Sequence, residues 1–329
     1  MKRARLDPHQ FIRRIPLLPH QLQQRLTPVE GAIVLCHLGV PRLSREEWSL
    51  AIEGLLARPR TLSFPDLLRY EKIEVASVHQ CAGSPLAPNE PTQRVCNVTW
   101  GGARLADILA DCAPHPSARF VWSSGADHGT FGEVSVEAYV KDLPIERLNS
   151  DVLVAYEMNG AQLAPENGFP ARLVVPGFYG TNSVKWLTCI TLAGERAQSP
   201  FTTRWYNDPV EGEPPGNRTT PVWAIAPQSV IVAPAPNATI PRFGAVEVWG
   251  WAWADGGVSK VEVTADADEW RLAALEPHSD RGWQRFSISW TPAWPGVTTL
   301  ASRATAVTGD TQPEMRTRNA IYRVPVKVA

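Results

Sequence analysis

The chain of 329 residues carries 32 Lys plus Arg and 33 Asp plus Glu, which gives a formal net charge of -1 at pH 7. A chain of this length exceeds one ordinary hydrophobic core, so two domains are expected. The balanced charge gives no reason to expect nucleic acid or an anionic membrane as a partner. No run of about 18 apolar residues occurs, so no transmembrane helix is predicted.

Residues 1–30 combine Pro, Gln and Arg with scattered apolar residues and are predicted to form an arm over a domain surface. No apolar stretch follows its charged start, so the pattern is not that of a secretory signal. We expect a soluble protein, cytoplasmic as written, or periplasmic if the chain is a trimmed mature form. The cysteines include no C-x-x-C pair, which indicates reduced thiols rather than a disulfide framework or a zinc site. They are Cys36, Cys81, Cys96, Cys112 and Cys189.

Short strands and short helices alternate in the next part of the chain. Apolar residues at every second position predict a half-buried strand over 48–54. Ser63 as a helix cap and Pro65 in the first turn predict a short helix over 63–70. Helical spacing of apolar residues predicts another helix over 105–112. Further predictions are strands over 75–80 and 119–122, a helix over 135–141, a strand over 152–158 with an Asn159-Gly160 hairpin turn, and strands over 172–175 and 184–191.

A stretch rich in Pro, Gly and acidic residues at 208–216 precedes a change of composition. From about residue 224 the chain shows only short strands with turn signals between them, which is typical of a β-sandwich of about 100 residues. The expected organisation is an N-terminal arm over 1–30, a catalytic domain over 31–222 and a sandwich domain over 223–329. The predicted sandwich strands cover 245–253, 258–264, 283–290, 299–307 and 322–328.

Two residues attract attention before any family is considered. The strand over 75–80 places Cys81 on a tight Ala-Gly turn, where a thiolate is open to a ligand. The alternative is an inert core cysteine, because free Cys often packs as a small hydrophobe. His37 lies in an apolar run over 33–41, where a hydrogen-bonded structural histidine is the alternative to a functional one.

Several motifs, taken in order, resemble the molybdopterin-binding domain of the sulfite oxidase family. They are Gln80-Cys-Ala-Gly83, Tyr156-Glu-Met-Asn-Gly160, Gly168-Phe-Pro170, Val175-Pro-Gly177 and Val184-Lys-Trp-Leu187. The resemblance covers nearly the whole chain. It implies an α+β fold, a sulfite-oxidase-type molybdopterin-binding domain, followed by an all-β immunoglobulin-like sandwich. In that family the second domain makes the dimer contact, so a homodimer is expected.

The resemblance also implies a set of site residues. Cys81 takes the place of the thiolate that binds molybdenum, a metal that needs a soft ligand beside its dithiolene pterin. Tyr206 aligns with the active-site tyrosine, with a packed loop aromatic as the alternative. The cofactor-binding positions are Cys81, His37 toward the pterin, Asn167 in place of a histidine, and Arg172, Ser183 and Lys185 toward the phosphate. For Arg172 and Lys185 the alternative is a solvated charge at a strand edge.

Departures from the family concern the substrate. Sulfite oxidases hold their dianionic substrate with arginines near the metal, and two of those positions are Leu35 and Leu86 here, with Cys36 replacing an Asn. Arg285 is a candidate for a third, substrate-binding arginine from the C-terminal domain. Losing two cations should weaken dianion binding by several kcal/mol, because charge-assisted hydrogen bonds contribute about 1.5–3 kcal/mol each.

The sequence therefore predicts a molybdenum-cofactor oxidoreductase that oxidises sulfite or a related small sulfur compound by oxygen-atom transfer. No C-x-x-C-H motif occurs, and no heme is expected in this chain, so electrons are expected to pass to an external acceptor such as cytochrome c. One alternative is a reductase of nitrate or a sulfoxide on the same cofactor. Another is a cofactor-free dimeric binding protein in which Cys81 is inert and the sandwich is the working surface.

Overall fold

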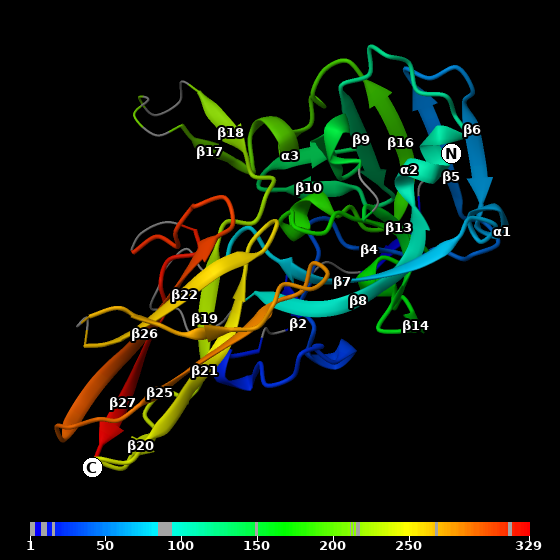
Figure 1. Ribbon diagram of the computed structural model, residues 1–329. Helices are drawn as coiled ribbons and strands as arrows, with labels where there is room; N and C mark the ends of the chain where they lie inside the picture. The colour runs from blue at the N-terminus through cyan, green and yellow to red at the C-terminus, as the bar shows by residue number, and fades with distance from the viewer. Residues whose placement is uncertain are drawn as a thin grey trace. The chain divides into compact units, whose positions relative to one another are not determined.

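The chain forms two compact units in the computed structural model (Figure 1). The structure describes residues 4–7, 12–14, 17–84, 94–148, 151–210, 212, 214, 218–266, 269–314 and 318–329. The first unit comprises Met1–Ile15, Val34–Val75 and Thr99–Trp223, and the second Pro16–Ile33, Ala76–Val98 and Ala224–Ala329. The domain limits expected from the sequence, at 30/31 and 222/223, stay a prediction. No helix among the described residues is both long and apolar enough to cross a membrane.

A five-stranded mixed sheet forms one half of the first unit, in the order β12-β9-β16-β5-β6. Its strands are β5 (Ser49–Gly54), β6 (Arg60–Ser63), β9 (Phe120–Gly125), β12 (Val140–Pro144) and β16 (Leu187–Ala193). β16 is parallel to β5, and the other neighbours are antiparallel. The predicted strand over 48–54 is confirmed, since Leu50 and Ile52 are buried while the residues between them are partly exposed.

A second sheet has the order β14-β13-β8-β7, with β15 also paired to β13. Its strands are β7 (Lys72–Gln80), β8 (Val95–Arg104), β13 (Leu153–Met158), β14 (Ala161–Gln162) and β15 (Arg172–Val174). The predicted hairpin is confirmed: Asn159 and Gly160 have φ of 51° and 74°, as a tight turn between two strands requires. The division between the two units falls inside β7 and inside β8.

Short helices complete the first unit. Ser63 caps α1 (Phe64–Leu67): its Oγ accepts from Asp66 N at 3.3 Å, and the Asp66 carboxylate accepts from Ser63 N at 3.1 Å. The Ser63 cap is what the sequence predicted, and the structure adds the reciprocal bond that makes it a capping box. The remaining helices are α2 (Leu105–Ala110), α3 (Pro200–Thr203), η3 (Ile145–Arg147), η4 (Pro165–Asn167) and η5 (Gly180–Asn182). Short strands also pair outside the two sheets: β1 (Leu6–Asp7) with β4 (Val40–Pro41), β2 (Ile12–Arg14) with β3 (Val34–Leu35), β10 (Gly129–Phe131) with β11 (Val134–Val136), and β17 (Asn207–Pro209) with β18 (Thr219–Pro221).

The predicted helix over 135–141 is wrong. This stretch instead ends the β10–β11 hairpin and begins β12, whose Lys141 faces Ser123 of β9 in the sheet register. The β-branched residues Val134, Val136 and Val140 favour strands, and pairing with the long β9 overrides the weak local helix signal. The consequence is that Lys141 becomes completely buried.

The strand predicted over 184–191 begins only at Leu187. Trp186 has a left-handed backbone, with φ of 50°, which is incompatible with a strand and costs a large side chain of order 1–3 kcal/mol. Its indole N–H donates to Pro165 O at 2.7 Å, and this contact holds the bend in place. Lys185 therefore lies on an irregular segment and not on a strand edge.

The second unit is a β-sandwich, as predicted. Its sheets have the orders β19-β21-β25-β24 and β20-β27-β26-β22-β23, and Figure 1 shows β19, β21 and β25 running side by side. The strands are β19 (Gln228–Ala233), β20 (Thr239–Ile240), β21 (Val246–Trp253), β22 (Val258–Ala265), β23 (Arg271–Leu272), β24 (Ala274–Leu275), β25 (Gln284–Trp290), β26 (Gly296–Ala306) and β27 (Arg323–Val328), and two short helices, η1 (Pro19–Gln21) and η2 (Val29–Gly31), precede them in the chain. Phe286 packs among Val248, Val261 and Val324, so both sheets contribute to one core.

Truncating that core should destabilise the second unit strongly. Phe286→Ala removes a fully buried ring, and we expect a loss of about 3–5 kcal/mol in the free energy of unfolding because a cavity remains. Leu272→Ala is the matched control, since Leu272 is 68% exposed in the same unit, and it should change stability by about 0.5 kcal/mol or less. Urea unfolding followed by tryptophan fluorescence measures both, and equal losses would contradict the assigned core.

Candidate functional site

A single turn, η4, gathers three donor side chains in the first unit. All three of its carbonyl oxygens accept hydrogen bonds from side chains that come from later in the chain. The pairs are Trp186 Nε1 with Pro165 O at 2.7 Å, Lys185 Nζ with Glu166 O at 2.9 Å, and Arg172 Nη1 with Asn167 O at 3.0 Å. Two of the three donors are cations, so the turn concentrates positive charge around a short piece of main chain.

Gly168 follows this turn and lets the two cations come close to it. Its φ of +106° is one that L-residues rarely adopt. A Cβ atom there would lie 3.0 Å from Arg172 Cβ and 3.2 Å from Lys185 Cβ. Glycine is therefore required at this position both by backbone conformation and by space.

Lys185 is a largely buried cation held by neutral groups. Besides Glu166 O, its Nζ donates to Leu35 O at 2.7 Å and to Cys36 Sγ at 3.2 Å. Among the described residues, no carboxylate lies within ion-pair distance of this Nζ. Burial lowers the pKa of Lys185 and raises the pKa of nearby Asp127 to about 7. The attraction between the two charges offsets only part of each shift.

Arg172, Ser183 and Asn167 complete the cluster, and each is only 4% exposed. Arg172 Nη2 donates to Ser183 O at 3.0 Å, and Ser183 Oγ accepts from Val175 N at 3.0 Å. The Oδ1 atom of Asn167 is buried and has no hydrogen-bond partner among the described residues. A buried acceptor without a donor costs about 1–3 kcal/mol, which an added donor group would recover.

His37 and Tyr206 form the second part of the site in this unit. His37 Nε2 is hydrogen-bonded to the Tyr206 hydroxyl, although the two residues lie 169 positions apart. Both side chains are partly exposed, and Tyr206 has a left-handed φ of 60°. Other aromatic rings surround His37, with centroids at 5.0 Å for Phe131, 5.1 Å for Tyr139 and 5.5 Å for Phe201. The structure thus brings together two residues that the sequence singled out separately.

Sequence reasoning missed Lys141, which lies against this pair. Its side chain is 0% exposed, and Nζ donates to Phe201 O at 2.8 Å and lies 5.2 Å from the centre of the Tyr206 ring. Burial lowers the pKa of Lys141 to about 7, an effect that Asp142 opposes and Arg196 reinforces. The signal in the sequence was a lysine inside an apolar run, which the helix prediction over 135–141 hid.

Cys81 belongs to the second unit and follows β7. Its Sγ accepts from Gly83 N at 3.3 Å, and its own N–H donates to Arg94 O at 2.8 Å. The loop is tied further by Arg94 Nη1 to Gly83 O at 3.2 Å and by Arg318 Nε to Ala82 O at 2.5 Å. Burial raises the pKa of the Cys81 thiol, and the Gly83 N–H and the two arginines offset part of that increase.

Gln80, directly before the cysteine, is fixed by an amide network. Its side chain is fully buried. Its Nε2 lies within hydrogen-bond distance of Gln228 Oε1 at 2.6 Å and Asn319 Oδ1 at 2.8 Å, and its Oε1 accepts from Trp253 Nε1 at 2.9 Å. A satisfied buried network of this kind specifies one geometry. The position of Cys81 within its unit is therefore set by the residue that precedes it.

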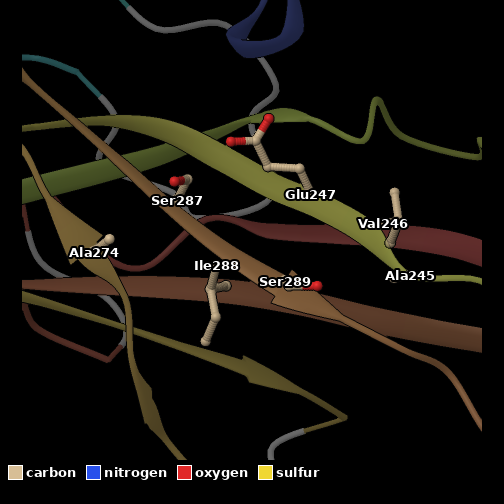
Figure 2. Close-up of a pocket in the computed structure, with 7 residues that line it drawn as sticks. All are labelled: Ala245, Val246, Glu247, Ala274, Ser287, Ile288 and Ser289. Carbon is tan, nitrogen blue, oxygen red and sulfur yellow. The ribbon is translucent and has the colours of Figure 1, made fainter.

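Arg285, the candidate substrate-binding residue, lies on β25 in the second unit. It donates to Glu247 Oε1 at 2.9 Å and stacks on the Trp249 ring, 4.8 Å from its centroid. Glu247 also lines a shallow groove with Ser287 and other small or aliphatic residues (Figure 2). A role for Arg285 in binding substrate stays a prediction. Leu86, one of the two leucine departures, lies outside the described residues.

Known families match both parts of the chain. Residues 37–201 match the oxidoreductase molybdopterin binding domain, and residues 219–324 match the Mo-co oxidoreductase dimerisation domain. The chain thus carries an oxidoreductase molybdopterin binding domain followed by a dimerisation domain. The chain belongs to the sulfite oxidase family, and the fold class expected from the sequence is confirmed.

The chain is similar to curated proteins of more than one activity. It is 33% identical to sulfite oxidase from Gallus gallus (76% of this chain, 59% of that protein) and 29% identical to mitochondrial sulfite oxidase from Drosophila melanogaster (92% and 55%). It is 30% identical to an NADPH nitrate reductase from Emericella nidulans (83% and 34%). The chain spans about half the length of the sulfite oxidases that it matches.

A solved structure covers nearly the whole chain. The sulfane dehydrogenase SoxCD from Paracoccus pantotrophus superposes with a TM-score of 0.79 and 27% identity, over 94% of this chain and 85% of that one. The cofactor of this family is molybdopterin carrying molybdenum. The residues around η4 fit such a group, because a buried lysine held by neutral acceptors and an unsatisfied Asn167 Oδ1 suit an anionic ligand that also offers donors.

The pH dependence of stability should reveal the buried Lys141. The folded chain releases the Lys141 proton near pH 7, whereas the unfolded chain holds it up to about pH 10.5. The wild type should therefore gain stability as pH rises from about 7 to 10, by at most about 1.4 kcal/mol per pH unit. Lys141→Met should be more stable than the wild type below pH 7, with the difference shrinking toward pH 10.

Thermal unfolding between pH 6 and pH 10 measures this effect. Lys260→Met is the control, because Lys260 is half-exposed on β22 and paired with Glu262. The control should follow the wild-type pH profile. A Lys141→Met profile parallel to the wild type would mean that Lys141 is ionised normally in the folded protein.

Proposed function

We propose that the protein oxidises sulfite or a related small sulfur compound by two electrons on its molybdenum cofactor and passes the electrons to an external acceptor such as cytochrome c. The observation that carries the proposal is Lys185, a largely buried cation whose hydrogen bonds among the described residues go to Leu35 O, Cys36 Sγ and Glu166 O. Burying a charge beside neutral acceptors is costly, and an anionic cofactor group gives it a purpose.

Each candidate residue then has a distinct role. Arg172 and Lys185 hold the cofactor phosphate through charge-assisted hydrogen bonds, with Ser183 and Asn167 beside them. His37 holds the pterin. When bound, the cofactor supplies the two-electron redox chemistry, and the protein positions and tunes it.

Cys81 provides the soft ligand that molybdenum requires. A thiol must lose its proton to bind a metal, and burial works against that loss in this loop. The Gly83 N–H, which donates to Sγ, and the nearby guanidinium groups of Arg94 and Arg318 stabilise the thiolate. Burial thus favours the protonated thiol in the free protein, and these donors favour the thiolate when a metal competes for the sulfur.

Tyr206 and His37 form a pair that can hold and move a proton beside the reacting group. The hydrogen bond between the Tyr206 hydroxyl and His37 Nε2 joins two groups that can each donate or accept a proton. The Tyr206 phenol can donate a hydrogen bond to an oxyanion when the imidazole of His37 does not hold the phenol's proton. We therefore assign the proton-handling role in this chain to Tyr206, with His37 orienting its hydroxyl.

A second reaction direction has support of its own. The chain is 30% identical to a nitrate reductase, and Leu35 and Leu86 stand where sulfite oxidases carry arginines. A reductase of nitrate or a sulfoxide is therefore the alternative on the same cofactor. A pocket with fewer cations suits a monoanion or a neutral sulfoxide better than a dianion, because each lost charge-assisted bond weakens binding. The SoxCD superposition supports the wider class of reduced sulfur compounds.

We also propose a homodimer that forms through the second unit. Residues 219–324 match a dimerisation domain. The unit exposes large apolar side chains, with Trp294 79% and Phe243 64% exposed, and the segments that carry them are joined by the hydrogen bond from Phe243 N to Pro292 O at 2.9 Å. Neighbouring exposed apolar groups of this size are typical of a protein interface.

Molybdenum and pterin content test the cofactor assignment. The wild type, expressed in a host that makes the cofactor, should contain about one molybdenum and one pterin per chain. Cys81→Ser should lose most of the metal, because the hydroxyl is a poor ligand for it. Lys185→Met should lose both metal and pterin, since a charge-assisted bond of about 1.5–3 kcal/mol corresponds to at least a tenfold weaker binding.

Two variants serve as controls in the same measurement. Cys189→Ser changes another partly exposed free cysteine, and Lys260→Met changes an exposed lysine. Both should load like the wild type, as shown by metal mass spectrometry and by fluorescence of the oxidised pterin. A folded wild type without molybdenum or pterin would leave the cofactor-free binding protein as the better proposal.

A steady-state comparison decides the direction of the reaction. We expect the loaded enzyme to reduce cytochrome c with sulfite or another reduced sulfur compound faster than it oxidises reduced viologen with nitrate or a sulfoxide. The KM for sulfite should be high, because Leu35 offers no cation to the dianion. Faster turnover with nitrate or a sulfoxide would favour the reductase instead.

A further inference from the structure

Lys141 is a buried cation with too few partners. Its side chain is 0% exposed, and an ammonium group carries three N–H donors. Among the described residues, Phe201 O is its one hydrogen-bond acceptor, at 2.8 Å. Nothing in the assigned cofactor chemistry uses this lysine. A buried ammonium with unused donors is expensive to maintain, so it calls for a role beyond packing.

The position of Lys141 on β12 directs it toward the Tyr206 ring and away from its acidic neighbour. Asp142 is also completely buried, but its carboxylate accepts from Arg196 Nε at 2.9 Å and from Ala197 N at 3.1 Å. That carboxylate is therefore already satisfied by a cation and a main-chain donor. Lys141 instead places its Nζ over the face of Tyr206, 5.2 Å from the ring centroid.

The ionisable groups around Lys141 are few. On its own strand there is Asp142, which favours the charged ammonium, and from the segment before α3 there is Arg196, which disfavours it. From the segment after α3 comes Tyr206, and His37 is hydrogen-bonded to that residue. A new negative charge beside the Tyr206 hydroxyl would therefore find Lys141 as a cation not committed to a carboxylate.

We propose that Lys141 is a positioning residue that acts through Tyr206: its ammonium favours a negatively charged group that accepts a hydrogen bond from the Tyr206 hydroxyl, and thereby selects an oxyanion substrate. This inference rests on the proposed function and deepens it, because it names the class of substrate. It also supplies a cation in a chain whose sequence has leucine at two of the family's arginine positions, 35 and 86. At an effective dielectric constant of about 20, a unit charge several ångströms away still contributes of order tenfold to anion binding.

The charge that Lys141 supplies depends on pH. With a pKa of about 7, the amine is protonated at pH 6 and mostly neutral at pH 8. Oxyanion affinity should therefore fall as pH rises through 7. His37 is another ionisable group bonded to Tyr206, so only removal of Lys141 can assign the effect.

Sulfate is a suitable probe because it is an unreactive oxyanion, and calorimetry of the holoenzyme gives its Kd without turnover. The wild type should bind sulfate at least about fivefold more tightly at pH 6 than at pH 8. Lys141→Met should bind more weakly at pH 6 and lose the pH dependence. Lys141→Arg keeps its charge at both pH values and should bind tightly at both. Lys260→Met should behave like the wild type.

Kinetics provide the second readout. In Lys141→Met, KM should rise at least about fivefold for an oxyanion substrate and stay unchanged for a neutral sulfoxide, because only the oxyanion senses the lost charge. Sulfate binding that is absent in the wild type, or unchanged in Lys141→Met with the same pH dependence, would overturn the inference and leave Lys141 a packing residue. Missing molybdenum, or a loaded enzyme with no turnover, would instead count against the proposed function, since sulfate binding needs neither.

Discussion

The hydrogen bonds from side chains to the carbonyls of η4 are the constraint on which the first unit's site depends. Three consecutive carbonyls accept from Trp186, Lys185 and Arg172, which lie 21, 19 and 5 positions after their acceptors. Main-chain acceptors satisfy the cations without neutralising them, as a carboxylate would. The cluster therefore keeps its positive charge available, and Gly168 allows the close approach that makes the arrangement geometrically feasible.

The cysteine loop of the second unit is built on the opposite electrostatic principle. There the fixed element is neutral, the buried amide of Gln80 with Gln228, Asn319 and Trp253 around it. A neutral network fixes the direction of the chain without changing the pKa of the Cys81 thiol. The Gly83 N–H and the guanidinium groups of Arg94 and Arg318 lower that pKa instead. Position and reactivity of Cys81 are thus controlled by different residues.

Local rules predicted much of the fold. Three features are each encoded within a few residues, and so they were visible in the sequence: the Ser63 cap, the alternation in β5 and the Asn159-Gly160 turn. Lys141 and Trp186 were not predicted correctly, because distant segments decide their conformation: pairing with β9 buries the lysine, and Pro165 O holds the tryptophan in a left-handed bend. The contact of His37 with Tyr206 likewise depends on tertiary structure and on no local pattern.

Four departures from local preference lie at the candidate site. Trp186 and Tyr206 have left-handed backbones. Within the part of the chain that the structure describes, Asn167 Oδ1 lacks a donor and the buried Lys141 ammonium has one acceptor. Each feature costs of order 1–3 kcal/mol, and a scaffold selected for stability alone would have removed them. These four residues belong to the two clusters that we propose bind charged groups. These features lower the free energy of unfolding at positions where binding of the proposed cofactor and oxyanion would raise it again. Binding should therefore rigidify the segments around Trp186, Tyr206 and Lys141, which local sequence rules describe least well.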